Sequence, residues 1–375
     1  MDWANRSLWG PIVATILLHA LLTSLYIAKH HGDPSFLTSV GRNRAGKRPY
    51  EAVTAPNGPN GYDGQFYYVI ARAPWRRQVK ALQGLDCVGA RQIRILYPAV
   101  CWMLSGGHAR LLFWTMPAVN VAALGCLAGL GAATARRFGL SVWWGLALPF
   151  AINAGMPVLR DLTEPLAMLG VFGLLSGWLL GARWWWLALW GFIAVFSREQ
   201  NIAIVGLVMF GAVVRRRWDI AAGLTAVLGS WLLFVCCLRI AYGEWPFLPS
   251  DGNIGQPFAG MASRWTHLGG DTRFSRRIAL ITAITLTQLA VEIAMALYVA
   301  ARPGDWVVKL CMMGGVLLAV LGGRFLYGDL WSYGRVFFWM PVGIWLCATQ
   351  MGRTHLLALL TPACFWYLVA LLDYV

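Results

Sequence analysis

The sequence lacks a paired metal-ligand spacing among its eight cysteines, most of which lie inside apolar runs. They are typical of small buried side chains and argue against a disulfide framework or a zinc site. The six histidines show no metal-ligand spacing either, apart from the adjacent pair His30 and His31. Gly-x-Gly patterns fall within apolar segments, where close helix packing is the usual reason for glycine, so no nucleotide fingerprint is present. We therefore expect no metal and no bound cofactor.

Charge is also scarce: charged residues make up 13% of the 375 residues, whereas hydrophobic residues make up 58%. The mean hydropathy is +0.58, and this composition predicts a polytopic membrane protein. The net charge of +15 is distributed among loops that border apolar spans, which favours anionic lipid and phosphate over nucleic acid as partners.

Apolar runs recur along the whole chain and predict an all-α membrane protein with about eleven transmembrane helices. Several runs are shorter than the roughly 20 residues that a straight crossing needs. Interior Pro149, Gly155 and Pro157 predict broken helices near a cavity. The runs are 8–28, 111–135, 142–158, 165–181, 184–196, 202–214, 220–240, 278–300, 306–322, 336–347 and 356–372.

The polar segments between these runs predict one transmembrane domain, 1–375, with two large loops. Residues 29–110 form a first loop that is too polar to cross a bilayer, and residues 242–277 form a second. The short arginine-rich connections all fall on one side if the spans alternate, and the positive-inside rule makes that side cytoplasmic. Both large loops and nearly every acidic residue then lie outside the cytoplasm.

The segment 61–68, with the sequence GYDGQFYY, places Asp63 in a glycine-flanked turn of the first loop. Glycine on either side permits turn conformations and close approach of a ligand. The aromatic residues Phe66, Tyr67 and Tyr68 are typical of a membrane–water boundary. Asp63 is our candidate general base, and the alternative is an ordinary Asx-type turn.

Paired charges stand at the outer ends of two predicted spans. Arg160, Asp161 and Glu164 mark one end, and Arg198 and Glu199 mark the other. Charges this near the hydrocarbon are costly unless they are paired or hydrated, and they indicate a functional site. The alternative is a set of structural ion pairs at helix ends.

Basic residues of the first loop are candidates to bind a lipid phosphate, because guanidinium grips phosphate with two hydrogen bonds. Arg91 and Arg94 are three residues apart and would share one helix face. The apolar stretch that follows is too short to span a bilayer. We expect residues 92–104 to form a helix in the outer interface.

Five short motifs carry a resemblance: YDGQFYY at 62–68, RILYP at 94–98, DLTEP at 161–165, SREQN at 197–201 and YGR at 333–335. With the membrane pattern, they make the chain similar to bacterial multi-span glycosyltransferases of the GT-C superfamily, in the mannosyltransferase-like group of cell-surface glycopolymer synthesis. The resemblance implies interfacial helices in the first loop, an acidic base there and a polyprenyl-phosphate sugar donor. Asp63 is the matching acid. Because glycine follows Asp63 and the next acid is Asp86, a metal held by neighbouring acids is not expected.

The implied function is inverting transfer of one sugar to a hydroxyl acceptor on a glycan, lipid or protein. The lipid-linked donor acts as co-substrate, and the site faces the periplasm or exterior of a bacterial inner membrane. The candidate phosphate-binding residues are Arg91, Arg94, Arg198 and Arg335. The candidate substrate-binding residues are Tyr62, Gln65, Tyr67, Arg160, Asp161, Glu164, Glu199 and Tyr333.

Two other functions stay open at the level of sequence. A flippase or transporter of polyprenyl-linked glycan would usually show internal repeats and charges near mid-bilayer. The sequence shows no half-to-half repeat, and its one clearly mid-span acid is Glu292. A lipid-linked glycan polymerase or ligase would share the same outer-face site.

Overall fold

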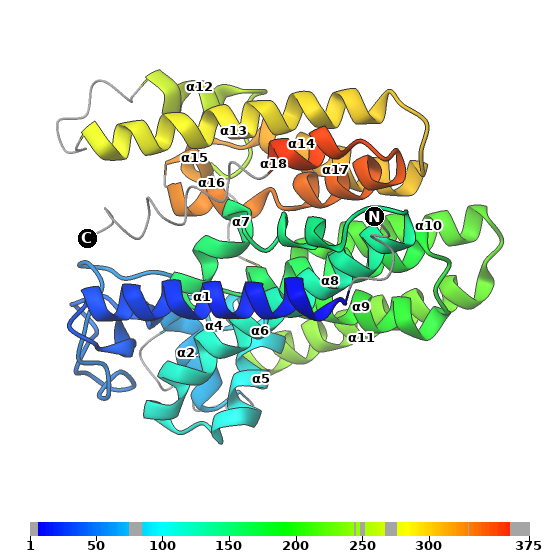
Figure 1. Ribbon diagram of the computed structural model, residues 1–375. Coiled ribbons are helices and arrows are strands. Elements are labelled where there is room, and N and C mark those ends of the chain that lie inside the picture. The colour runs from blue at the N-terminus through cyan, green and yellow to red at the C-terminus, as the bar shows by residue number, and fades with distance from the viewer. Residues whose placement is uncertain are drawn as a thin grey trace. The chain divides into compact units, whose positions relative to one another are not determined.

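The computed structural model describes residues 7–74, 85–243, 245–247, 252–266, 276–328 and 330–360. Within these ranges the protein is helical, with isolated bridges between Val40 and Gly61 and between Ile254 and Gly322 as its β-type pairing. The all-α class predicted from the sequence is thereby confirmed (Figure 1).

Four of the helices are long and apolar enough to cross a membrane: α1 (Trp9–Lys29), α6 (Ala109–Arg137), α11 (Trp218–Tyr242) and the Ala279–Ala300 part of α13 (Arg276–Ala300). They coincide with four of the eleven predicted spans. Shorter apolar helices, given in the next paragraphs, occupy other predicted spans. A total of eleven crossings stays a prediction.

Contacts divide the chain into two compact units, each built from separate parts of the sequence. Unit 1 comprises Met1–Pro11, Ala128–Met156 and Pro249–Val375, and unit 2 comprises Ile12–Leu127 and Pro157–Leu248. The single transmembrane domain expected from the sequence stays a prediction. The two units are described separately.

Unit 2 contains most of α1 and α6, together with the first loop and a group of four packed helices. The loop contributes η2 (Pro34–Thr38), α2 (Gly64–Arg72), α4 (Val88–Gln92) and α5 (Leu96–Ser105). The packed helices, green in Figure 1, are α8 (Glu164–Leu179), α9 (Trp184–Ser197), α10 (Ile202–Val214) and α11, with η5 (Glu199–Asn201) between α9 and α10. The segment before α8 forms η4 (Met156–Arg160), most of which belongs to this unit.

The helix predicted for residues 92–104 is present as α5, but it begins four residues later, and residues 93–95 separate it from α4. Pro98 explains the break. Proline has no N–H to donate, and its ring would clash with the carbonyl four residues earlier, which is that of Arg94. The break turns the chain between Arg91 on α4 and Arg94.

Unit 1 contains η3 (Val142–Leu146), α7 (Ile152–Gly155) and the helices from α12 onward: α12 (Ala259–Thr266), α13, α14 (Trp306–Leu321), α15 (Arg324–Tyr327), α16 (Leu330–Val336), α17 (Trp339–Gln350) and α18 (Thr354–Leu360). The helix α14 packs against α17 and α13. Asp305 caps its N-terminus by accepting hydrogen bonds from the amides of Val307 and Val308, at 2.9 and 3.2 Å. The predicted break in residues 142–158 is confirmed, since η3, α7 and η4 replace a continuous helix.

Candidate functional site

Asp63 occupies the turn that leads into α2, at the N-terminal end of that helix. Gly61 has a φ of +72°, a left-handed conformation that glycine adopts without steric cost. Gly64 lies so close to Arg160 that a Cβ atom there would be 2.1 Å from the Arg160 carbonyl oxygen. The two glycines thus allow the Asp63 turn to press against the segment before α8.

The amide of Gln65 connects the two ends of the loop that precedes α2. Its Oε1 accepts from the backbone amide of Gly41 at 3.4 Å, and its Nε2 donates to the carbonyl oxygen of Asn60 at 3.1 Å. Beside it, the Tyr62 amide donates to the Ser39 carbonyl at 2.7 Å. We predicted that Gln65 binds substrate. In the structure, its side chain contacts the loop and supports it.

The aromatic residues after Asp63 do not lie on the surface. Phe66, Tyr67 and Tyr68 are buried, and the rings of Tyr68 and Phe113 stack with centroids 5.3 Å apart. The rings of Tyr67 and Tyr68 lie in the core formed with α5 and α6, whereas the Phe66 ring lies beneath Arg91. Their predicted place at a membrane–water boundary stays a prediction. Burying such large rings fixes α2, and with it the position of Asp63.

Arg91 on α4 joins Asp63 to a second carboxylate. Its Nη1 donates to Asp63 Oδ1 at 2.9 Å, while Nε and Nη2 donate to Oδ1 and Oδ2 of Asp86 at 3.0 and 2.8 Å. The guanidinium also lies over the Phe66 ring, 4.1 Å from its centroid. Arg91 is thus fixed on three sides. Burial opposes ionisation of Asp86, but the hydrogen bonds and charge of Arg91 lower the pKa of that carboxyl.

Arg94 repeats this arrangement with different partners. Its Nε and Nη2 donate to the two oxygens of Glu199 at 2.7 and 2.5 Å, and its Nη1 lies 3.0 Å from the Tyr67 hydroxyl. Burial alone would raise the pKa of Glu199, but the charge and hydrogen bonds of Arg94 lower it to about 2. Tyr67 stands one helical turn after Asp63, so both arginines present Nη1 to the same face of α2.

A further ion pair lies deeper in unit 2. Arg198 at the end of α9 pairs through Nη1 with Glu164, the first residue of α8, and both side chains are almost fully buried. Asn120 on α6 supports the same region, since its Nδ2 donates to the Leu162 carbonyl at 3.1 Å. These contacts hold the segment 160–164 in place.

Asp161 lies inside this segment and is fully buried. Its φ of +50° is unusual for a residue other than glycine, although aspartate tolerates it better than most. Neither carboxyl oxygen has a hydrogen-bond partner among the residues that the structure describes. Burial raises the pKa of the Asp161 carboxyl well above its usual value.

Arg160 completes the group in unit 2. Its Nη1 lies 3.5 Å from Ser39 Oγ, and its guanidinium lies 5.9 Å from the centroid of the Tyr62 ring. The structure thus brings together most of the predicted site. The residues gathered in unit 2 are Tyr62, Asp63, Gln65, Tyr67, Arg91, Arg94, Arg160, Asp161, Glu164, Arg198 and Glu199.

Two predicted residues, Tyr333 and Arg335, belong to α16 in unit 1. Both are buried, and the Tyr333 ring stacks on that of Tyr327 with centroids 5.3 Å apart. Glu292, the mid-span acid of α13, accepts a hydrogen bond at 3.2 Å from Gln288 on its own helix. That contact agrees with a structural role for Glu292.

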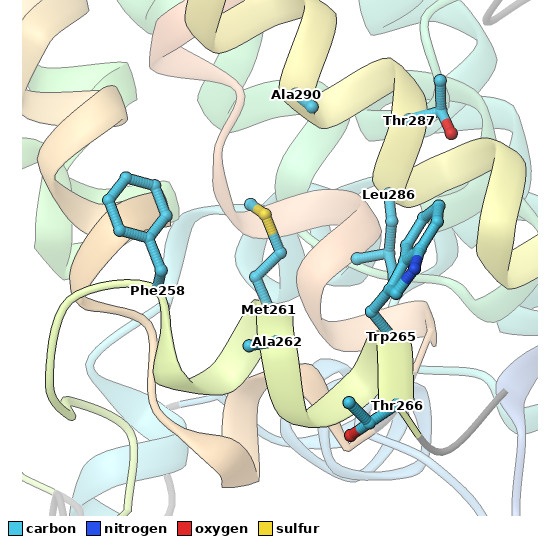
Figure 2. Close-up of a pocket in the computed structure, with 8 residues that line it drawn as sticks. All are labelled: Phe258, Met261, Ala262, Trp265, Thr266, Leu286, Thr287 and Ala290. Carbon is cyan, nitrogen blue, oxygen red and sulfur yellow. The ribbon is translucent and has the colours of Figure 1, made fainter.

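Unit 1 also holds a cavity of about 400 Å³ between α12 and α13 (Figure 2). Met261 and Trp265 reach it from α12, and Leu286 and Ala290 reach it from α13. Its eight lining residues include no acid and no base. The cavity can accommodate apolar groups, and its lining offers no group to transfer a proton or bind an anion by charge.

Asp86 and Phe66 were missed as site residues by the sequence analysis. Asp86 also accepts from the Cys87 amide at 2.8 Å, at the start of α4. An acid directly before a short helix that carries Arg91 was the available signal.

Among the described residues, no group of three His, Cys, Asp or Glu side chains is placed to hold a metal ion.

A scan of the sequence against family models gave no match, and searches of curated proteins and of solved structures gave none either. The resemblance to GT-C glycosyltransferases therefore depends on the five short motifs and on the membrane pattern.

Proposed function

We propose that this protein is an inverting glycosyltransferase that moves one sugar from a polyprenyl-phosphate donor to a hydroxyl acceptor. The proposal places the reaction at the outer face of a bacterial inner membrane, with Asp63 as the general base. Support comes from the all-helical, membrane-type fold and from the motif resemblance. The observation that carries it is the partly exposed Asp63 carboxylate, which sits at a helix end among arginines.

The proposed reaction makes two demands on the site. As the acceptor oxygen attacks the anomeric carbon, it must lose a proton, which one well-placed carboxylate can take. The bond between that carbon and the donor phosphate breaks at the same time, and the phosphate leaves with the electron pair. Fixed cations stabilise the charge that develops on it.

The arginines of unit 2 are suited to this second demand, although each already contacts a carboxylate. Arg94 and Arg91 are only 12% and 11% exposed, and both present Nη1 towards α2. A donor phosphate would join them beside Asp63 and Tyr67, or would displace Glu199 from Arg94. Arg198 is held by Glu164 in the interior and is the less accessible candidate.

The test uses membranes that carry the protein and a panel of polyprenyl-phosphate sugars, assayed in detergent. A transferase consumes donor without a sealed compartment, whereas a flippase or transporter does not. Asp63→Asn should reduce turnover by about 10²–10⁴-fold, because it removes the base and keeps the shape of the side chain. Asp219→Asn is the matched control. Asp219 lies on α11 in an exposed ion pair with Arg217, so this variant should keep full turnover. If Asp63→Asn kept more than a tenth of the activity, the assignment of the base would be wrong.

A further inference from the structure

Arg91 divides its hydrogen bonds unequally between two carboxylates. The edge formed by Nε and Nη2 is engaged by both oxygens of Asp86, at 3.0 and 2.8 Å. Asp63 receives one N–H of Arg91, on Oδ1 at 2.9 Å. A guanidinium binds a carboxylate most strongly through two parallel hydrogen bonds, so Asp86 holds the stronger geometry and Asp63 the weaker one.

This division matters because a base must keep its affinity for a proton. An arginine that gripped Asp63 through a full edge would stabilise the ionised carboxylate and weaken it as a proton acceptor. The Phe66 ring, 4.1 Å from the guanidinium carbon, and the Cys87 amide bound to Asp86 keep Arg91 and Asp86 in this arrangement.

We propose that Asp86 is a positioning residue that occupies the bidentate edge of Arg91 and thereby limits Arg91 to a single hydrogen bond with Asp63. Asp86 thus sets the proton affinity of the candidate base without touching substrate. Its effect on turnover rests on the proposed function, whereas its effect on the protonation of Asp63 does not.

The charges around Asp63 come from several elements, and the comparison of variants must hold them constant. Among the residues that the structure describes, the titratable and charged groups that face it or adjoin it include Arg91, Asp86, Arg94, Tyr67, Glu199 and Arg160. The Arg94–Glu199 pair has the same geometry but directs its Nη1 to Tyr67. Glu199→Gln is therefore a matched control, because it weakens the equivalent pair of hydrogen bonds on the neighbouring Arg94.

The test measures the labelling of Asp63 by a carbodiimide, which modifies protonated carboxyl groups, as a function of pH in the purified full-length protein. Peptide mass spectrometry gives the pH at which half of Asp63 is labelled. In Asp86→Asn this midpoint should fall by about one pH unit, because Arg91 is freed to grip Asp63 more fully. In Arg91→Gln it should rise by a similar amount. Asp86→Glu should restore most of the wild-type value, and Glu199→Gln should move the midpoint less than Asp86→Asn does.

Turnover gives the second measurement. Asp86→Asn should lower kcat by about three- to tenfold and move the acid limb of the pH profile downward, while the thermal unfolding temperature stays unchanged. An unchanged or raised labelling midpoint in Asp86→Asn would overturn the positioning role, whatever the turnover. Absence of donor consumption by the wild type, with the labelling shifts intact, would contradict the proposed transferase function and leave the positioning role standing.

Discussion

The charged groups of unit 2 fall into two layers with different access to solvent. The outer pairs, Arg91–Asp63 and Arg94–Glu199, have side chains that are 11 to 28% exposed. The inner pair, Arg198–Glu164, is 6 and 0% exposed. An outer pair can exchange a partner with a ligand, whereas the inner pair cannot do so without opening the fold.

The neighbours Arg198 and Glu199 show why this difference matters. They adjoin in sequence, yet Arg198 turns inward to Glu164 on α8 and Glu199 turns outward to Arg94. The same arginine–acid signature thus has a structural role in one layer and a candidate role in chemistry in the other. Substitutions in each layer test this difference.

The largest effect is expected from breaking the inner pair. Glu164→Gln leaves the Arg198 charge buried without its carboxylate, which costs about 3–5 kcal/mol of unfolding free energy. The Arg72–Glu51 pair is the control, because its side chains are 31 and 50% exposed, and Glu51→Gln should cost less than about 1 kcal/mol. Thermal unfolding in detergent measures the loss of stability in both variants. If Glu164→Gln and Glu51→Gln lost equal stability, the inner pair would not differ from an exposed one.

A smaller effect is expected where the Asp63 turn meets the inner layer. In Gly64→Ala the new methyl group would meet the Arg160 carbonyl at 2.1 Å, so the backbone must shift at a cost of about 1–3 kcal/mol. Gly206→Ala on α10 is the control, since no atom lies within 4 Å of the place that its methyl group would take. An unfolding temperature of Gly64→Ala equal to that of the control would show that the turn is not packed against Arg160.

The smallest effects concern pH, and they have opposite signs for Glu199 and Asp161. The pKa of Glu199 is lowered to about 2 from 4.5, so the stability that it contributes is complete above pH 4.5 and is lost as the pH falls towards 2. The pKa of Asp161 is raised, so the unfolded chain binds fewer protons there and this acid lowers stability as the pH rises above 3.8. Asp161→Asn should therefore unfold at a higher temperature than the wild type at pH 8 and at the same temperature at pH 3. Glu199→Gln should reduce the loss of stability between pH 4.5 and 2. Thermal scans in which Asp161→Asn reduced this acid loss, and Glu199→Gln raised the unfolding temperature at pH 8, would contradict both predictions.

The long helices and the broken segment 142–158 could be predicted because apolar runs, proline and glycine act locally along the chain. The partners of the charges could not. Arg94 and Glu199 are separated by 105 residues, and Arg91 and Asp63 by 28. Which carboxylate an arginine meets depends on how α2, α4 and the end of α9 pack, and the sequence pattern does not encode that packing. The burial of Tyr67 and Tyr68 was missed for the same reason.

The loop before α2 is held to that helix both at its ends and in its middle, and this has a consequence for how the protein can vary. Gly41 and Asn60 both bind the Gln65 side chain, and Val40 and Gly61 form a bridge that closes the ends of the loop. Within the loop, Tyr50 and Val53 lie in the same core as Tyr67 and Tyr68, and the Tyr50 hydroxyl donates to the Gln65 carbonyl at 3.4 Å. Arg72 on α2 forms an ion pair with Glu51 at 3.2 Å. Residues 49–53 therefore help to hold the helix that follows Asp63. In a laboratory-evolved variant, substitutions that leave Asp63 in place would be sought first at the exposed positions 46–48 of this loop, and not at its buried residues.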